Sequence, residues 1–215
     1  MIKKILISIG ITVIAAGVAI GALYLVKLAQ PAPAAKVSAS KTLILDHSKD
    51  YGACTLLTTS SIKTALGDTA TNLQAQENVG ITRDNYFGNG VQNIVSDSQT
   101  CIYAFAPGSN AKNTLDATNG FTVKKTVFTN KDGPKELINQ TKLDPSKTVI
   151  NSLGDIAFYS ANNVAQGPGA TYNFELQIFK SNESTSYTIS QPAKNSTFTA
   201  DTAKTALLAL AALAK

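Results

Sequence analysis

The most constraining feature of this sequence is an uninterrupted apolar run near its amino terminus. Residues 5–26 are 22 consecutive uncharged residues rich in Ile, Val, Ala and Leu, with Lys3 and Lys4 before them and Lys27 after them. As a helix rising about 1.5 Å per residue, this run is roughly 33 Å long, enough to cross the hydrocarbon core of a bilayer. We therefore expect residues 1–28 to form a cytoplasmic stub and a single transmembrane helix.

Two other interpretations of this run stay open. A secretory signal peptide normally has a shorter apolar region, of about 7 to 15 residues, followed by a small-residue cleavage site. Ala32-Pro33-Ala34 matches such a site imperfectly, and a buried helix of a soluble protein would also be apolar. The length favours an uncleaved signal anchor. Gly17 and Gly21 form a Gly-x-x-x-Gly pair, which lets two membrane helices approach closely and suggests a homodimer through the anchor.

The distribution of charge places the rest of the chain outside the cytosol. The net charge is +5, from 19 basic and 14 acidic residues. Lys3, Lys4, Lys27 and Lys36 account for +4 of it, leaving 15 basic against 14 acidic residues, a net of +1. Lysines before the apolar run and a nearly neutral domain after it favour an inside amino terminus and an extracytoplasmic domain in the cell membrane. With Arg83 as the single arginine and no basic stripe, we expect no nucleic-acid partner.

A tether connects the anchor to the domain. Residues 29–41 contain Pro31 and Pro33 followed by small polar residues, a composition that cannot build a core. At about 3.1 Å per residue this segment extends up to roughly 40 Å from the membrane. The extracytoplasmic domain is therefore expected to occupy residues 42–215.

The chain has two cysteines, Cys54 and Cys101. An even count in an oxidising compartment predicts one structural disulfide between them. A redox pair or a metal site is disfavoured, because there is no Cys-x-x-Cys motif and the only histidine, His47, has no ligand partner at a recognisable interval. We expect no metal and no cofactor.

Local patterns predict three helices in the domain. Thr58 or Thr59 can cap a short helix that ends at Gly67. Asp132-Gly133-Pro134 opens a second short helix, since proline suits the first helical turn. The Ala- and Leu-rich segment 199–215 predicts a longer terminal helix with a periodic apolar stripe. The stripe consists of Ala203, Ala206, Leu207, Leu210 and Leu213.

Alternation of apolar and polar residues predicts the strands. The expected strands are 99–105, 120–128, 155–160, 172–180 and 184–190, the last two joined as a hairpin by Ser181-Asn182-Glu183. Between the first two lies a turn-rich segment, 107–119. Strands with segregated helices define an α+β fold: an antiparallel sheet on which a short N-terminal helix and a longer C-terminal helix pack, preceded by a single transmembrane helix.

Several spaced landmarks resemble a family. They are Cys54-Thr55-Leu56-Leu57-Thr58 leading to Ala65-Leu66-Gly67, then Cys101-Ile102-Tyr103, then 153–159 (Leu-Gly-Asp-Ile-Ala-Phe-Tyr), and the Ala/Leu-rich last helix. Together they look like an uncharacterised group of secreted actinobacterial lipoproteins. The resemblance implies an α+β envelope domain similar to PsbP and Mog1, with the disulfide joining the first helix region to a strand. This chain has a membrane anchor in place of a lipidated cysteine, and the family offers no catalytic residues.

These features favour a non-catalytic binding or envelope-structural role over catalysis. His47 lies beside the tether and outside any Gly-x-Ser-x-Gly elbow, so we expect no catalytic triad. A hydrolase that uses two carboxylates stays open as an alternative. A pilin-like filament subunit is a second alternative, although the apolar run lacks that family's glutamate and Gly-Phe processing site.

The long polar segment from Gly80 to Ser98 is the expected position of a ligand site, because long loops without strong patterning often carry function. Tyr86, Phe87 and Asn89 are the candidate ligand-binding residues. The aromatic residues could instead only hold the loop against the sheet. The expected partners are the membrane, through residues 5–26, and an envelope glycan, lipid or protein.

Overall fold

A computed structural model describes residues 48–86, 94–105, 119–129, 132–164 and 170–214 of the chain. The predicted anchor, the tether, His47 and the turn-rich segment 107–118 lie outside the described residues. Among the described residues, no helix is long and apolar enough to span a bilayer.

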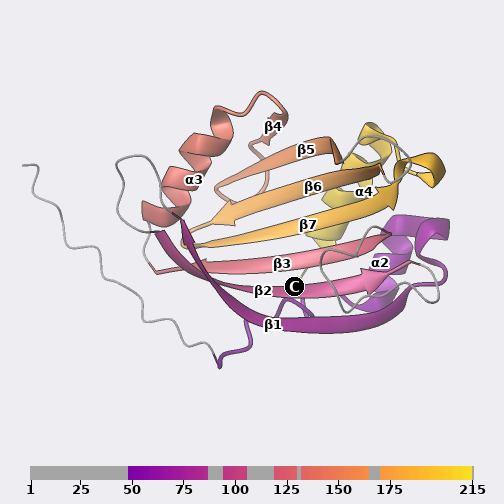
Figure 1. Ribbon diagram of the computed structural model, residues 1–215, viewed down its shortest axis with the longest axis horizontal. Helices are drawn as coiled ribbons and strands as arrows, with labels where there is room; N and C mark the ends of the chain where they lie inside the picture. Colours follow the sequence, from indigo (N-terminus) through magenta and orange to yellow (C-terminus); the bar gives the residue numbers. More distant parts are fainter. Residues whose placement is uncertain (1–47, 87–93, 106–118, 130–131, 165–169, 215) are drawn as a thin grey trace, which may run out of the picture. The chain divides into compact units, whose positions relative to one another are not determined.

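The described residues form one antiparallel sheet of seven strands, in the order β1-β2-β3-β7-β6-β5-β4 (Figure 1). Every neighbouring pair is antiparallel. The strands are β1 (Gln74–Tyr86), β2 (Ile94–Ala104), β3 (Gly120–Phe128), β4 (Lys147–Ile150), β5 (Ile156–Val164), β6 (Thr171–Lys180) and β7 (Glu183–Pro192). β1 and β4 are the two edges, so the chain enters the sheet at one side and reaches the other side before it returns to the middle with β7.

Three α-helices accompany the sheet, and their ends follow from local chemistry. Helix α2 (Thr59–Leu66) begins after Thr58, whose side chain accepts a hydrogen bond from the backbone N–H of Ser61, and it ends at Gly67 with φ of 58°. Helix α3 spans Asp132–Lys142. Helix α4 (Ala200–Leu213) follows Thr199, which forms a reciprocal capping box with Thr202. Two short 3-10 turns, Gly67–Ala70 and Ala193–Asn195, complete the fold.

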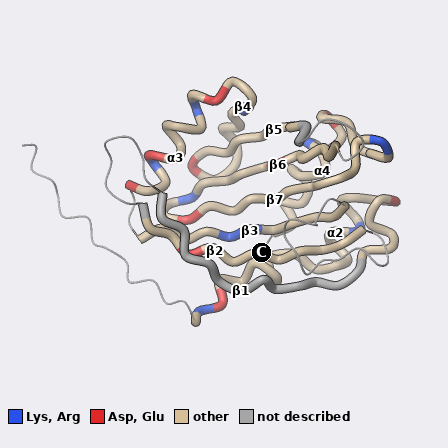
Figure 2. The backbone as a smooth tube through the Cα atoms, in the orientation of Figure 1, with Lys and Arg blue, Asp and Glu red and all other residues tan. Residues whose placement is uncertain are grey.

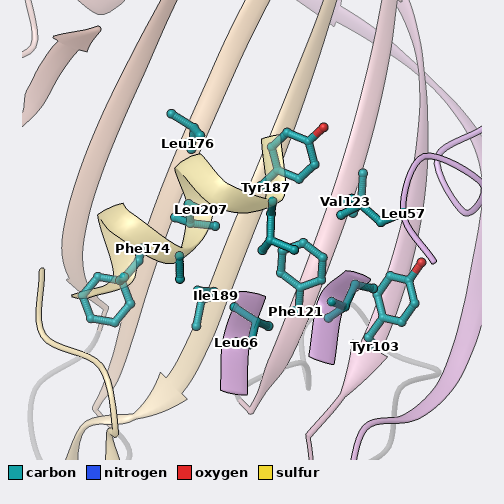
Figure 3. Packing of buried hydrophobic residues seen from close by; sticks show 14 of the residues in the cluster. Leu57, Leu66, Tyr103, Phe121, Val123, Phe174, Leu176, Tyr187, Ile189 and Leu207 are labelled. Carbon is teal, nitrogen blue, oxygen red and sulfur yellow. The ribbon is translucent and has the colours of Figure 1, made fainter. Parts of the chain in front are cut away.

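The main core lies between one face of the sheet and helices α2 and α4. Alternate residues of the central strands point to this face, because side chains alternate across a strand. Phe121 of β3 is fully buried; its ring centroid lies 5.8 Å from that of Tyr103 and 6.4 Å from that of Tyr187. Leu66 of α2 and Leu207 of α4 are buried in the same cluster (Figure 3). The two helices therefore cover one continuous apolar surface, which extends across the neighbouring strands β2, β3, β7, β6 and β5.

On the opposite face of the sheet, helix α3 packs over a small apolar cluster. Leu137 and Ile138 of α3 contact Phe128, Ile156, Phe158 and Phe179 there. Elsewhere the same face carries the buried Ile102 of β2, and β7 places four hydroxyl side chains on it. These are Ser184, Ser186, Thr188 and Ser190. Figure 2 shows few charged positions along the central strands, apart from two neighbouring lysines in β3.

The segment before α2 is joined to β2 at three successive positions. The Tyr51 hydroxyl donates to the Asp97 carboxylate at 3.2 Å. The backbone N–H of Ala53 donates to the Gln99 carbonyl oxygen at 3.1 Å. Cys54 forms a disulfide with Cys101. Asp97, Gln99 and Cys101 alternate along the strand and so share one face. We call residues 51–54 and these three partners the β2 latch.

The structure confirms the α+β class, the helices packed on the sheet and the disulfide. The predicted helix cap at Thr58, the terminal helix after Thr199 and the hairpin of β6 and β7 are also confirmed. Within that hairpin the turn is formed by Ser181 and Asn182, since Glu183 already belongs to β7. The packing of α3 on the other face was not predicted.

Two sequence predictions are wrong, and one strand was missed. The Gly80–Ser98 segment is not a long loop, because Gly80 to Tyr86 belong to β1 and Ile94 to Ser98 belong to β2, paired in register from Ile81–Gln99 to Tyr86–Ile94. Leu213 was placed on the buried stripe of α4, but it is 45% exposed. It is the last residue of the helix. The sequence analysis also omitted β4, a four-residue edge strand.

The disulfide should contribute a large share of the stability. Cross-linking residues 47 apart in sequence removes unfolded-state entropy, worth about 4 kcal/mol. We expect the double variant Cys54→Ala/Cys101→Ala to lose roughly that much free energy of unfolding in urea titrations of the full chain. Addition of a reductant should lower the stability of the wild type to that of the variant and leave the variant unchanged. Equal stability of wild type and variant in the absence of reductant would contradict a structural role for the disulfide.

Two glycines with similar backbone angles provide a matched test of close packing. Gly154 has φ of 60°, and a Cβ added there would lie 2.4 Å from the Phe179 carbonyl oxygen, whereas Gly67 has φ of 58° and nothing within 4 Å. Gly67→Ala should therefore cost about 1–3 kcal/mol of unfolding free energy, the backbone strain of an alanine at φ of 58° and ψ of −139°. Gly154→Ala should cost at least ~2 kcal/mol more, because the β5–β6 backbone must shift. Thermal unfolding of both variants measures the difference, and similar losses would refute the steric explanation.

Candidate functional site

Phe198 lies between two open depressions and is the centre of the candidate site. It is the residue before the N-cap of α4, and it is partly buried against the main core. Both depressions use Phe198 as a wall. We call the depression between α2 and α4 the inner depression, and the one between α4 and the end of strands β5 and β6 the outer depression.

The inner depression has a volume of about 350 Å³. Its floor is formed by small side chains of the two helices, and its polar groups come from the first turns of α4. The lining residues are Ala65, Phe198, Asp201, Thr202, Thr205, Ala206 and Ala209. Asp201 is the only charged residue among them.

The outer depression has a volume of about 360 Å³ and is the more aromatic of the two. Tyr172 and Phe174, alternate residues of β6, have ring centroids 6.1 Å apart at an interplanar angle of 38°. The remaining lining residues are Ala161, Asn162, Phe198, Thr199 and Ala200. None of these seven residues is charged at neutral pH.

A buried glutamine fixes the turn that carries Phe198. Gln191 at the end of β7 is 3% exposed. Its carbonyl oxygen accepts hydrogen bonds from the Thr197 backbone N–H at 3.0 Å and from the Ser196 hydroxyl at 3.2 Å, and its amide donates to the Thr197 hydroxyl at 3.1 Å. The Thr197 hydroxyl also lies 2.8 Å from that of Thr69. These bonds connect the turn both to the sheet and to the 3-10 turn after α2.

The start of α4 is fixed by Tyr159. The Tyr159 hydroxyl donates to the backbone carbonyl of Ala200, and the Lys204 ammonium lies 5.7 Å from the centre of the Tyr159 ring. Burial, with a smaller contribution from the Asp201 carboxylate, raises the pKa of Tyr159 to about 12. Tyr159 therefore stays neutral, and its hydroxyl remains a hydrogen-bond donor over the whole physiological range.

Of the three predicted ligand residues, Tyr86 alone lies within the described part of the chain. Tyr86 is the last residue of β1, and its backbone pairs with Ile94. Phe87 and Asn89 lie outside the described residues. By register, the Tyr86 end of the sheet is opposite to the end that carries Tyr172, as Figure 1 also shows. The Tyr86 backbone thus lies at the other end of the sheet from the depressions beside Phe198, and the role assigned to Tyr86, Phe87 and Asn89 stays a prediction.

The sequence contained one pattern that indicates a structural role for Phe198. An apolar residue just before a capping threonine is typical of the hydrophobic staple at a helix start. That pattern indicates a local packing role and does not reveal the depressions. Tyr172 and Asn162 approach Phe198 only through the pairing of β5 with β6 and the crossing of α4, so no local pattern could have identified them.

The polar cluster around Lys147 on the other face is structural in character. The Lys147 ammonium donates to the Ser160 hydroxyl at 3.0 Å and to the Glu175 carboxylate at 3.1 Å. A lysine that activates a serine must be uncharged to accept its proton, whereas this ammonium forms an ion pair. Ser160 is also only 2% exposed, beyond the reach of a substrate. The cluster joins β4, β5 and β6.

Within the described ranges, no three His, Cys, Asp or Glu side chains converge on a position that could hold a metal ion. Comparison of the chain with protein-family models, with curated protein sequences and with solved structures gave no match. The interpretation of the site therefore rests on its own geometry.

Removing the Gln191 side chain should loosen the turn that carries Phe198. Gln191→Ala leaves the Thr197 N–H without its acceptor and should cost about 1–3 kcal/mol of unfolding free energy. Gln177→Ala, on the half-buried polar face of β6, is the matched control and should cost less than ~1 kcal/mol. Hydrogen exchange should show faster exchange of the Thr197 amide in Gln191→Ala only. Unchanged exchange at Thr197 would show that other contacts hold the turn.

Proposed function

We propose that this chain is a membrane-anchored extracytoplasmic domain with a non-catalytic binding or envelope-structural role. Residues 1–28 would supply the stub and the anchor, residues 29–41 the tether, and residues 42–215 the domain. The resemblance to secreted actinobacterial lipoproteins, including their PsbP/Mog1-like fold, belongs to this proposal. So does the homodimer through Gly17 and Gly21.

The disulfide is the observation that carries the proposed location. Disulfides form and persist in oxidising compartments and are rare in the cytosol. The bond between Cys54 and Cys101 lies against the main core, with Cys101 fully buried. An apolar run of 22 residues precedes this domain. An export signal followed by a disulfide-bonded domain supports placement on the outer side of a membrane.

Binding is favoured over catalysis by the character of the concave surfaces. Among the described residues, aromatic, small and hydroxyl side chains predominate in the lining of the depressions beside Phe198, and Asp201 is the one charged residue. The Lys147 ammonium, which donates to the Ser160 hydroxyl, also donates to the Glu175 carboxylate. Open pockets with apolar walls and a few polar groups are typical of ligand-binding sites.

A fractionation experiment tests the proposed anchorage. The full chain should stay with the membranes after a carbonate wash. Trypsin added to the outside should cut the tether at Lys36 or Lys41 and release a domain whose thiols react with maleimide only after reduction. The double variant Ile14→Lys/Val18→Lys should move the protein out of the washed membranes, because a central lysine costs about 2.5–3.5 kcal/mol on insertion.

The matched control is Ser38→Lys/Ser40→Lys, which adds the same charge within the tether and should leave membrane retention unchanged. Recovery of the wild type in the soluble fraction before trypsin would contradict the anchor. Free thiols in the native protein would contradict the extracytoplasmic placement.

A further inference from the structure

From strand β5 and the outer depression beside it, we infer a binding site for an extended segment of a protein partner. The segment pairs with β5 and adds a strand to the sheet. The inference rests on the proposed binding role and specifies the chemistry of the partner. It depends on two features: backbone groups of β5 that face away from β6, and a depression that receives one side chain of the added strand.

Strand β4 covers only the first part of β5 (Figure 1). β4 pairs with β5 from Ala157 to Ser160, whereas β6 pairs with β5 along its whole length, to Val164. Among the described residues, no strand lies beside β5 on the β4 side after Ser160. We call this side of residues 161–164 the open edge.

Burial along β5 changes where β4 ends. Ala157, Tyr159 and Ser160, which lie beside β4, are at most 6% exposed. Ala161 and Asn162, the next two residues of the same strand, are exposed. The open edge is therefore accessible, and an added strand there continues the interface that β4 already forms with β5.

Local chemistry ends β4 at Lys147. The Asp144 carboxylate accepts hydrogen bonds from the Ser146 backbone N–H at 2.9 Å and from the Ser146 hydroxyl at 2.7 Å. The Lys147 N–H donates to the Asp144 carbonyl at 3.1 Å. These bonds close a turn before β4, and they engage the Ser146 N–H within that turn. The chain itself therefore does not extend β4 along the open edge.

The backbone groups of Ala161 and Asn163 point toward the open edge. In an antiparallel sheet, the N–H and C=O of one residue face the same neighbouring strand, and successive residues alternate between the two neighbours. The Ala193 N–H donates to the Ala170 carbonyl at 2.8 Å, so even-numbered residues of β6 bond to β7 and odd-numbered ones bond to β5. The odd-numbered residues of β6 are opposite even-numbered residues of β5. Odd-numbered residues of β5, which include Ala161 and Asn163, therefore face the β4 side.

The outer depression lies where a side chain of the added strand enters. Ala161 is directly opposite Phe174, so both side chains point to the sheet face that carries α4. A residue of the added strand opposite Ala161 points to the same face, into the depression of about 360 Å³ beside Tyr172 and Phe198. Ala161 is small and leaves this volume open. The aromatic walls favour an aromatic or large aliphatic side chain.

The residues on either side of that apolar residue are polar. Asn162 is exposed and, by alternation along β5, points to the other face of the sheet. The two neighbours of the apolar residue in the added strand point to that face too, beside Asn162 and water. Strand addition obtains affinity from main-chain hydrogen bonds and specificity from pockets for alternate side chains. The partner is therefore an extended segment with one apolar residue between polar ones.

The wall of the depression opposite β5 is ordered before the partner arrives. Gln191 fixes the turn that carries Phe198, and Tyr159 fixes the Ala200 carbonyl. The capping box of Thr199 fixes the first turn of α4. A wall that is ordered in advance lowers the entropy cost of binding.

Fluorescence anisotropy with the full chain in phosphatidylcholine nanodiscs tests the inference. The probe is a fluorescein-labelled peptide, Lys-Thr-Gln-Thr-Phe-Thr-Gln-Thr-Lys, which places one phenylalanine among polar residues. We expect saturable binding to the protein and none to empty nanodiscs. Replacing the phenylalanine of the probe by serine should weaken binding about tenfold, because no ring enters the depression.

A second probe tests the main-chain hydrogen bonds. It carries methyl groups on the backbone nitrogens of its phenylalanine and of the residues two positions before and after it. These nitrogens face β5 when the phenylalanine lies opposite Ala161, so methylation removes the donors of the added ladder. The methylated probe should bind at least about tenfold more weakly than the first probe.

Variants of the chain test the depression and the open edge separately. Ala161→Phe fills the depression and should weaken binding about tenfold. Asn139→Phe, which adds the same ring to an exposed position of α3, is the matched control and should bind like the wild type. Asn163→Pro removes an N–H that faces the open edge and should abolish binding, while the pairing with β6 persists. If thermal unfolding shows that Asn163→Pro is not folded, Ala161→Phe still tests the inference.

Three results would overturn the inference: no saturable binding of the first probe, equal binding of the two probes, or equal binding by wild type and Ala161→Phe. The second result would assign the depression to an apolar group that binds without strand pairing. Membrane retention and trypsin release are measured on the same preparation. An anchored domain that does not bind the probe therefore refutes the added strand alone, whereas an unanchored protein refutes the proposed placement.

Discussion

Burial of one apolar sheet face beneath α2 and α4 is the constraint on which the structure depends. Phe121, Tyr187 and Leu176 come from three adjacent strands, and the helices remove all of them from water. A side chain of this size gains about 1.5–3 kcal/mol on burial. Without the two helices this surface would be exposed. This requirement determines the position of α4. It therefore also determines the position of Phe198 and of the turn that precedes the helix.

The candidate site is a consequence of how α4 enters its position. Between the end of β7 and the first turn of α4, the chain must cross from the sheet to the helix layer, and Gln191 satisfies the polar groups of this crossing. Phe198 anchors the crossing to the core but does not fill the space on either side. The unfilled volume beside a rigid aromatic residue is what makes ligand binding feasible on an otherwise ordinary α+β domain.

The elements that the sequence predicted correctly are those with strong local signals. Thr58 caps the start of α2, and Gly67 ends the helix. The alternation of apolar residues defines β3. β1 carries no such signal, because its residues are mostly polar and its register is interrupted between Asn78 and Ile81. β4 has only four residues. The site was missed for a different reason: Asn162, Tyr172 and Phe198 meet through long-range pairing, which a single sequence does not encode in any local pattern.

The β2 latch determines how the domain would respond to tension. A domain held at its amino terminus receives any pull through residues 51–54, and the bonds to Asp97, Gln99 and Cys101 pass this load to β2. β2 is hydrogen-bonded to β1 and β3 on its two sides. The load therefore reaches a strand inside the sheet that is hydrogen-bonded to a neighbour on each side. In the proposed anchored state, the disulfide would pass a pull on the amino terminus to β2 before the pull reached helix α2.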